Sequence, residues 1–387
     1  MSVTAASGFV AAGGVAGLKA SGDPDVALVA TENGLPTAVA GVFTSNLMCA
    51  APVTVSRRHL ATTNGYAVGV VLNAGNANAA TGPQGEADAE ATCSAVADVL
   101  GCESDQILVC STGLIGIPLP VDKLIAAVPA VAAGLGVDGA ISAAEAIRTT
   151  DTVRKEVAVA GPGFTVGGMA KGAAMLQPNM GTMLAVLTTD AEASPETLHE
   201  VLTAAVRYSF NVLSVDGCTS TNDTVLLFAS GRNGPANHEA LAAAVATACS
   251  SLAEQMAADA EGATKVIRVS VTGAVSDEEA ETAARAIANS ALCKCSWFGE
   301  DPYWGRVASE IGASGAQMDP GHLQISYGGV TVARGGAPTN HDESAVAAHM
   351  AGQRIDLVCD LGLGPGRAFI LTNDLTHAYV DENKGTS

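Results

Sequence analysis

Residues 167–188 of the chain read GGMAKGAAMLQPNMGTMLAVLT, from Gly167 to Thr188. The first part is rich in glycine and contains Pro178, a composition typical of a tight loop. The second part, from Met183 to Thr188, is an apolar run of the length of a strand. The sequence therefore predicts a loop that delivers the pair Gly181-Thr182 to the start of a buried strand.

The pair Gly181-Thr182 suits self-cleavage. A tight loop can hold the Gly181 carbonyl against the Thr182 hydroxyl, so that the acyl group moves from nitrogen to oxygen before the chain is cut. Thr182 would then begin a new chain, and its α-amine, with an ordinary pKa of about 7.7 to 8.0, could serve as base for its own hydroxyl. An ordinary strand threonine after a glycine turn is the alternative, and on this pair alone it is the simpler interpretation.

Length and composition predict a globular protein of two domains. The chain has 387 residues, and single cores usually stop growing at about 250 to 300. Hydrophobic residues make up 48% and charged residues 15%. We expect the boundary after the Ala-rich helix His238–Ala260, which gives a catalytic domain over 1–265 and a smaller C-terminal α/β domain over 266–387.

Short apolar runs alternate with Ala-rich stretches, which predicts the α/β (α+β) class. The expected strands are Tyr66–Leu72, Gln106–Cys110, Met183–Thr188, Thr224–Ala229, Val266–Thr272 and Ile355–Leu361.

Two expected helices have clear start signals. Ser194-Pro195 supplies a cap and a first-turn proline before Thr197–Tyr208. Ser276 and Glu279 have the spacing of a capping box before Ala280–Ser290.

The charge of the chain argues against several classes of partner. Thirty-nine acidic and nineteen basic residues give a formal net charge of -20, which repels nucleic acid and anionic lipid. No apolar run approaches the length that spans a bilayer, and residues 1–19 lack the basic start of a signal peptide. We expect a cytoplasmic protein without nucleic-acid or membrane partners.

Metal and nucleotide motifs are absent from the sequence. The nine cysteines include no C-x-x-C pair, and the seven histidines include no HExxH pair. Cys293 and Cys295 would share one face of a strand, where a structural role is expected. Pro365 interrupts the glycine-rich segment 362–366, so a dinucleotide fingerprint is not indicated. We expect no metal and no cofactor.

Several further motifs are spread over nearly the whole chain in one order. They are Gly8-Phe9-x-Ala11-Ala12-Gly13, Asn73-Ala74-Gly75-Asn76-Ala77-Asn78, Cys110-Ser111-Thr112-Gly113-Leu114-Ile115-Gly116, Lys171-Gly172-x-x-Met175, Pro178-Asn179-Met180-x-Thr182-Met183-Leu184, Thr219-Ser220-Thr221-Asn222-Asp223-Thr224, Asp259-Ala260-Glu261-Gly262-x-Thr264-Lys265 and Trp304-Gly305-Arg306. This set resembles the ornithine acetyltransferase family, whose bifunctional members are also called glutamate N-acetyltransferase.

The resemblance implies an αββα sandwich similar to N-terminal nucleophile hydrolases, cut between Gly181 and Thr182. The α chain would be 1–181 and the β chain 182–387, assembled as an α2β2 tetramer. The implied reaction is ping-pong: acetyl passes from N-acetylornithine to Thr182 and then to glutamate, within arginine biosynthesis. Acetyl-CoA stays open as an acetyl donor.

The resemblance also assigns site residues. Thr112 and Gly113 match the donors of the oxyanion hole, at the end of an expected strand. Substrate contacts are implied for Thr182 itself and for Thr149, Lys171, Glu261, Asn383 and Ser387. Lys171 could meet a substrate carboxylate and Glu261 a substrate amino group.

Some positions depart from the family pattern. Gly181 stands where alanine is usual, Tyr303 replaces an asparagine, and Cys293-Lys294-Cys295 is bulkier than its counterpart. The short tail leaves open whether Thr386 or Ser387 takes the terminal role. A self-processing amidase or aminopeptidase, a paralogue with another acyl acceptor, and a non-enzymatic amino-acid-binding protein stay open as alternatives.

Overall fold

The computed structural model describes residues 2–177 and 183–385. The chain divides into unit 1, Met1–Asn211 with Thr219–Met256, and unit 2, Val212–Cys218 with Ala257–Ser387. The sequence placed the boundary after residue 265, whereas the structure places it before Ala257. Residues just after the long helix already belong to unit 2, because the backbone N–H groups of Thr264 and Lys265 both donate to Asp374 Oδ1 at 2.9 Å.

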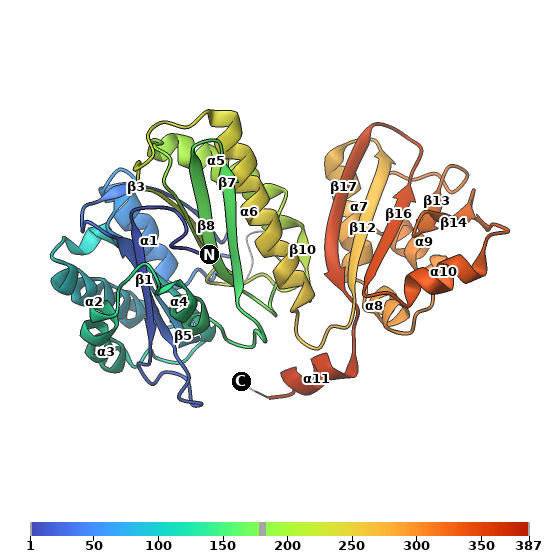
Figure 1. Ribbon diagram of the computed structural model, residues 1–387. Coiled ribbons are helices and arrows are strands. Elements are labelled where there is room, and N and C mark those ends of the chain that lie inside the picture. The colour runs from blue at the N-terminus through green and yellow to red at the C-terminus, as the bar shows by residue number, and fades with distance from the viewer. Residues whose placement is uncertain (1, 178–182, 386–387) are drawn as a thin grey trace. The chain divides into compact units, whose positions relative to one another are not determined.

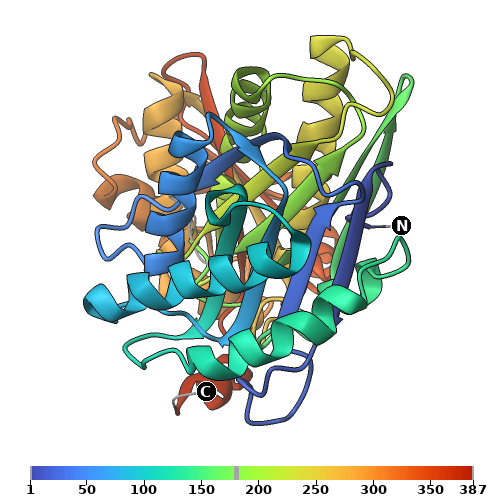
Figure 2. The same ribbon diagram turned by 90° about the vertical axis from the view of Figure 1, so that its left-hand side faces the viewer.

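The first sheet of unit 1 has four strands in the order β1-β2-β5-β6. Only β5 and β6 run parallel. The strands are β1 (Phe9–Gly14), β2 (Val26–Thr31), β5 (Gly69–Asn76) and β6 (Ile107–Leu114), the last preceded by a 3-10 turn (Ser104–Gln106). The outer face is covered by α1 (Ala51–Thr62), α2 (Gly82–Leu100) and α3 (Val121–Ala133), and Figure 2 shows α2 and α3 side by side across the strands.

The second sheet of unit 1 has six strands in the order β4-β3-β11-β9-β8-β7. They are β4 (Tyr66–Ala67), β3 (Thr37–Phe43), β11 (Thr224–Ala229), β9 (Leu184–Thr189), β8 (Phe164–Lys171) and β7 (Lys155–Gly161). Helix α5 (Pro195–Arg207) packs on β3 and β11. Helix α6 (His238–Ala258) lies along β7, where Gln255 Nε2 donates to the Glu156 carbonyl oxygen at 3.1 Å. The short helix α4 (Ala140–Ala146) packs on β1 and β2.

The two sheets of unit 1 face each other through one apolar core. Phe9, Leu72 and Leu108 from the first sheet pack with Val186 and Phe228 from the second. Every residue of β9 and β11 is buried, which explains why their sequences are apolar without alternation. Helices, two sheets and helices follow one another, as Figure 1 shows for unit 1, so the predicted αββα sandwich is confirmed.

Unit 2 is an α/β unit around one seven-stranded sheet, which confirms the expected smaller α/β domain. The strand order is β10-β17-β12-β16-β13-β14-β15, and β10 is contributed by the segment 212–218. Its strands are β10 (Leu213–Ser214), β12 (Val266–Ala274), β13 (Gln324–Tyr327), β14 (Val330–Arg334), β15 (Ala337–Pro338), β16 (Arg354–Asp360) and β17 (Gly366–Asn373). Its helices are α7 (Asp277–Asn289), α8 (Ala291–Phe298), α9 (Trp304–Ala313), α10 (Glu343–Met350) and α11 (His377–Asn383). The core gathers around the buried Trp297.

The predicted helix starts are confirmed, one of them with a difference. Ser194 Oγ accepts the Thr197 N–H, and Ser276 Oγ accepts the Glu279 N–H, both at 3.3 Å. The capping box expected at Ser276 is only half formed, because the Glu279 carboxylate accepts hydrogen bonds from the backbone and side chain of Gln317 instead.

The segment Cys293-Lys294-Cys295, whose cysteines would share one face if it were a strand, is helical. These residues lie in α8, which begins at a cap where Ser290 Oγ accepts the Cys293 N–H at 3.3 Å. With helical spacing the two cysteines no longer share a face, so Cys293 is buried and Cys295 exposed.

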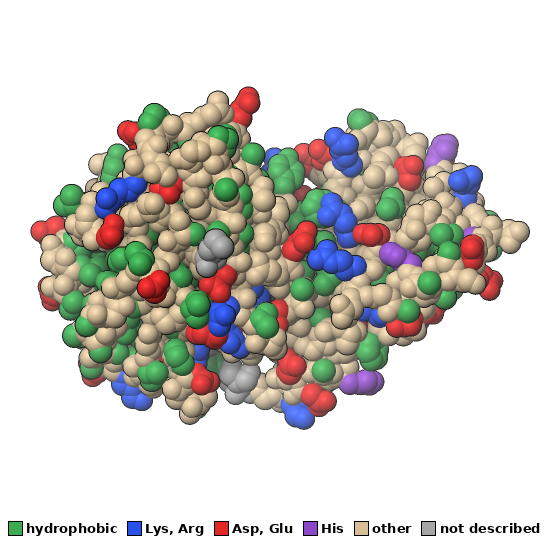
Figure 3. All heavy atoms as spheres, in the orientation of Figure 1, with side chains coloured by type: hydrophobic (Ala, Val, Ile, Leu, Met, Phe, Trp, Pro, Cys, Tyr) green, Lys and Arg blue, Asp and Glu red, His purple; other side chains and the backbone are tan. Residues whose placement is uncertain are grey.

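On the face that Figure 3 displays, charged side chains are scattered singly or in small groups over a largely uncharged surface, in keeping with the low charged fraction. Among residues 2–177 and 183–385, no helix is long and apolar enough to cross a membrane.

Leu108→Ala tests the core between the two sheets. Leu108 is fully buried there, so the change should destabilise the protein by about 2–5 kcal/mol. The control is Leu35→Ala, at a leucine that is 62% exposed, which should change stability little. Denaturant midpoints at one protein concentration measure both, and equal midpoints for the two variants would contradict this account of the core.

Candidate functional site

Lys171 is the residue around which the predicted site of unit 1 is built. It ends β8, its side chain is buried, and its Nζ donates a hydrogen bond to Thr112 Oγ1 at 3.2 Å. Because β8 and β6 belong to different sheets, this contact links the two layers of the sandwich. The structure thus brings together two of the residues predicted from the sequence.

Thr112 and Gly113 lie near the end of β6, which continues to Leu114, beyond the expected strand Gln106–Cys110. The strand extends because it pairs in parallel with β5, with an irregular register at Gly75 and Asn76. Gly113 has φ +133°, and a Cβ there would lie 2.3 Å from the Gly75 carbonyl carbon. Only glycine fits this position, and it is exposed next to the buried Thr112 hydroxyl.

Side-chain amides fix the strand ends around Thr112. Asn222 Nδ2 donates to the carbonyl oxygen of Ser111 at 2.9 Å and to that of Ala77 at 2.6 Å. Ser111 Oγ in turn donates to Asn73 Oδ1 at 2.6 Å. Asn222 precedes β11 of the second sheet, so this network holds the end of the first sheet against the second.

Asp151 is a buried residue of this site that the sequence analysis did not single out. It receives a hydrogen bond from Lys155 Nζ at 2.6 Å and lies 3.9 Å from Lys171 Nζ. Burial alone would raise the pKa of Asp151, but Lys171 and Lys155 outweigh burial and hold that pKa below its ordinary value. One signal in the sequence could have identified Asp151. It lies two residues after Thr149, a predicted substrate contact, and four residues before Lys155, in a chain with only nineteen basic residues.

Thr149 lies half-buried after α4, and its backbone N–H donates to Asp151 Oδ2 at 3.1 Å. The predicted residues Thr149, Lys171 and Thr112 are therefore joined through one carboxylate and one ammonium group.

Asp223 anchors the strand that follows the predicted cleavage point. Its Oδ1 accepts the backbone N–H of Met183 at 2.7 Å, and Oδ2 has no hydrogen-bond partner among the residues that the structure describes. Complete burial raises the pKa of Asp223 well above its ordinary value, and the Met183 N–H offsets this only in part. Gly181, Thr182 and Ser387 lie outside the described residues.

Glu261 and Asn383 meet in unit 2. Asn383 Nδ2 donates to Glu261 Oε2 at 2.7 Å and also to the Tyr379 carbonyl oxygen at 2.9 Å. Glu261 lines a cavity of about 190 Å³ that Asp216 and Lys294 line as well.

The Lys294 ammonium beside this cavity is held in place by unit 2. It donates to the carbonyl oxygens of Val215 and Asn373, both at 2.9 Å, and to Thr372 Oγ1 at 2.5 Å. Burial lowers the pKa of Lys294 to about 8, although Asp216 and Asp374 raise it. Three carboxylates, of Asp216, Glu261 and Asp374, and one ammonium group, of Lys294, line this cavity, and the excess of acidic groups suits a cation.

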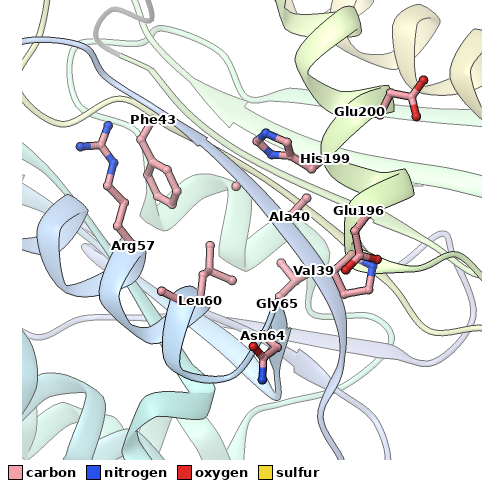
Figure 4. A pocket seen from close by; sticks show the side chains of 13 residues that line it. Val39, Ala40, Phe43, Arg57, Leu60, Asn64, Gly65, Glu196, His199 and Glu200 are labelled. Carbon is pink, nitrogen blue, oxygen red and sulfur yellow. The ribbon is translucent and has the colours of Figure 1, made fainter.

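A second cavity of about 610 Å³ lies in unit 1 between α1 and α5, over β3. Figure 4 shows Phe43 and Leu60 on one side of it and His199 on the other, with Arg57 beside the Phe43 ring. None of its lining residues is a predicted site residue. Over the described ranges, no group of three or more His, Cys, Asp or Glu side chains could hold a metal ion.

Gly113→Ala tests the conformation at the end of β6. The Cβ would clash with Gly75 and the backbone would be strained by about 1–3 kcal/mol, so the melting temperature should fall clearly. Gly116→Ala is the matched control, since Gly116 also has positive φ, +78°, but a Cβ there meets nothing within 4 Å. Thermal unfolding measures both variants. A fall in melting temperature for Gly116→Ala as large as that for Gly113→Ala would refute the steric argument.

Comparison with known proteins gives matches over the full length. The model of the ArgJ family matches residues 10–385. A protein of Streptomyces coelicolor named arginine biosynthesis bifunctional protein ArgJ is 49% identical, with 100% of both chains covered. A protein of the same name from Mycobacterium tuberculosis strain H37Rv is 48% identical, with 100% of this chain and 96% of that protein covered.

Solved structures with similarity to this chain include two crystal structures. One is the arginine biosynthesis bifunctional protein ArgJ of Bacillus halodurans, with 35% identity, a TM-score of 0.49, and 51% of this chain and 96% of that chain covered. The other is ornithine acetyltransferase of Mycobacterium tuberculosis complexed with ornithine, with 44% identity, a TM-score of 0.41, and 46% and 94% covered.

Proposed function

The chain belongs to the ArgJ family, and from this premise we propose that it is a self-processing acetyltransferase that moves acetyl from N-acetylornithine to glutamate in arginine biosynthesis. The observation that carries the proposal is the buried contact of Lys171 with Thr112. It joins a cation and an oxyanion-hole candidate within a chain that matches the family from residue 10 to residue 385.

In the first half-reaction the Thr182 hydroxyl attacks the acetyl carbonyl carbon of N-acetylornithine. The α-amine of Thr182 takes the hydroxyl proton, the amide C–N bond breaks, and ornithine leaves with a proton on its nitrogen. In the second half-reaction the amine of glutamate attacks the acetyl ester. N-acetylglutamate leaves, and the Thr182 hydroxyl regains its proton.

Each attack creates an oxyanion that needs donors already in place. The hydroxyl oxygen of Thr112 accepts a hydrogen bond from Lys171, so the hydroxyl hydrogen can point to a different acceptor. With the Gly113 N–H it would form the oxyanion hole, where removal of one donor typically costs about 2.7–4 kcal/mol.

The substrate is a small amino acid with charges of both signs, and the proposed contacts match them. The Lys171 ammonium would pair with a carboxylate, with Thr149 beside it. Glu261, supported by Asn383, would pair with an amino group, and the acidic wall formed with Asp216 favours a cation such as ornithine. Ser387 completes the proposed substrate contacts. The proposed enzyme is a cytoplasmic α2β2 assembly that needs no cofactor. Acetyl-CoA is an additional acetyl donor to be tested.

Thr182→Ala tests self-processing. Without the hydroxyl no acyl shift can occur, so denaturing gels should give one intact band, whereas the wild type should give fragments 1–181 and 182–387. Thr62→Ala, at an exposed helix position, is the control and should still be cut. An intact wild-type chain would refute the proposal.

The same preparation separates the alternative activities. After brief exposure to N-acetylornithine, mass spectrometry should find an acetyl adduct on the fragment that begins at Thr182, and glutamate should remove it as N-acetylglutamate. Free acetate in place of N-acetylglutamate would indicate an amidase, and binding without any adduct would indicate a non-enzymatic protein.

Thr112→Ala tests the oxyanion hole. The loss of one donor should lower kcat by about 10²–10³-fold while the protein stays folded. Thr112→Ser keeps the hydroxyl and should retain most of the rate. Full turnover by Thr112→Ala in a steady-state assay would remove this residue from the proposed mechanism.

A further inference from the structure

The Asp151 carboxylate accepts hydrogen bonds from Thr149, Lys155 and Gly172 and lies 3.9 Å from the Lys171 ammonium. We propose that Asp151 is a positioning residue that holds Lys171 and Thr149 in place, and that Lys155 neutralises Asp151 so that Lys171 keeps its charge for a substrate carboxylate. This inference rests on the proposed function and adds two residues to it.

The two carboxylate oxygens of Asp151 have different partners. Oδ1 accepts the Lys155 ammonium at 2.6 Å and the Gly172 backbone N–H at 2.7 Å. Oδ2 accepts the Thr149 backbone N–H at 3.1 Å and lies 3.9 Å from Lys171 Nζ. One oxygen is thus fixed by the fold, and the other faces the two residues that the proposed function assigns to the substrate.

The distances show that Asp151 interacts with the two lysines in different ways. Lys155 Nζ donates a charge-assisted hydrogen bond to Oδ1 at 2.6 Å, whereas Lys171 Nζ lies 3.9 Å from Oδ2, beyond hydrogen-bond distance, and is attracted through its charge alone. Counted over Asp151, Lys155 and Lys171, two cations and one anion give a net charge of +1, and the other carboxyl group that interacts with Lys171, that of Asp223, has its pKa raised by burial, which favours its neutral form. A substrate carboxylate beside Lys171 would therefore meet a positive site, whereas Asp151 without Lys155 would cancel the charge of Lys171.

Lys155 forms a buried ion pair with Asp151, and its ammonium also donates to the Val153 carbonyl oxygen at 3.4 Å. Its side chain and that of Asp151 are both fully buried, and apolar residues often replace a buried ion pair without loss of stability. Asp151 also joins three segments that end at one place, namely the loop after α4, the start of β7 and the end of β8. The pair therefore fixes the segments on which Thr149 and Lys171 lie, and so their positions in the proposed site.

Two variants separate charge from position. Lys155→Met leaves Asp151 opposite Lys171 alone, so the cluster becomes neutral, and KM for N-acetylornithine should rise about tenfold with a smaller change in kcat. Asp151→Asn combined with Lys155→Met keeps the charge of +1 but leaves one acceptor oxygen in place of two, so the Thr149 and Gly172 N–H groups must share it and Lys171 loses its anion. Here KM should rise and kcat should also fall about tenfold, because the contact of Lys171 with Thr112 loosens.

Arg154→Met is the matched control, because Arg154 is a partly exposed neighbour paired with Glu145 and Glu156, and its loss should leave KM unchanged. Unchanged KM and kcat in both test variants of an active enzyme would overturn this inference alone. If neither test variant shows a cooperative unfolding transition, the ion pair is needed for folding, and this result would also overturn the inference. A wild type that makes no N-acetylglutamate would remove the proposed function, and this inference with it.

Discussion

One hydrogen bond between facing sheets, from the Lys171 ammonium to the Thr112 hydroxyl, organises the site of unit 1. A lysine ammonium is rarely placed inside a sandwich core, because burial removes its water and must be offset by nearby anions and acceptors. Asp151 supplies that anion, and its own burial is tolerated because Lys155 and two backbone N–H groups surround it. Each of these groups is placed by the end of a strand or the loop next to it.

The small residues of the chain make this arrangement possible. Only 4% of residues are aromatic, so the two sheets of unit 1 meet mainly through alanine, valine and leucine. At the end of β6 the backbone of Gly113 lies so close to Gly75 that a single Cβ would not fit. Close approach of β5 and β6 thus holds the Thr112 hydroxyl and the exposed Gly113 backbone at the edge of the core.

Local signals in the sequence predicted the parts of the fold that depend on neighbours in the chain. Thr224–Ala229 forms a strand with the predicted bounds, and Ser194 caps a helix as its spacing indicated. The αββα order came instead from the resemblance. Alternation in a short run such as Cys293-Lys294-Cys295 cannot distinguish strand from helix, and the local signal that marks the helix is the cap at Ser290.

The site shows the same division between local and long-range information. Lys171 and Thr112 could be named from motifs, but their contact joins residues far apart in the sequence and needs the sandwich to bring them together. Asp151 was missed because a carboxylate in a polar turn resembles any surface residue until its burial is known. The segment 212–218 joins the sheet of unit 2 through β10, a pairing that no local pattern announces.

The strand order of the second sheet determines what a cut before Thr182 would do to the molecule. Strands β9 and β11 would belong to the new fragment, and both sit between β3 and β8 of the old one, with hydrogen-bonded neighbours on each side. The two fragments would therefore share one hydrogen-bonded sheet and could not separate without exposing the interior of the sandwich. Such a cut would free the amino group of Thr182 while the strands of both fragments keep their hydrogen-bonded neighbours in the sheet.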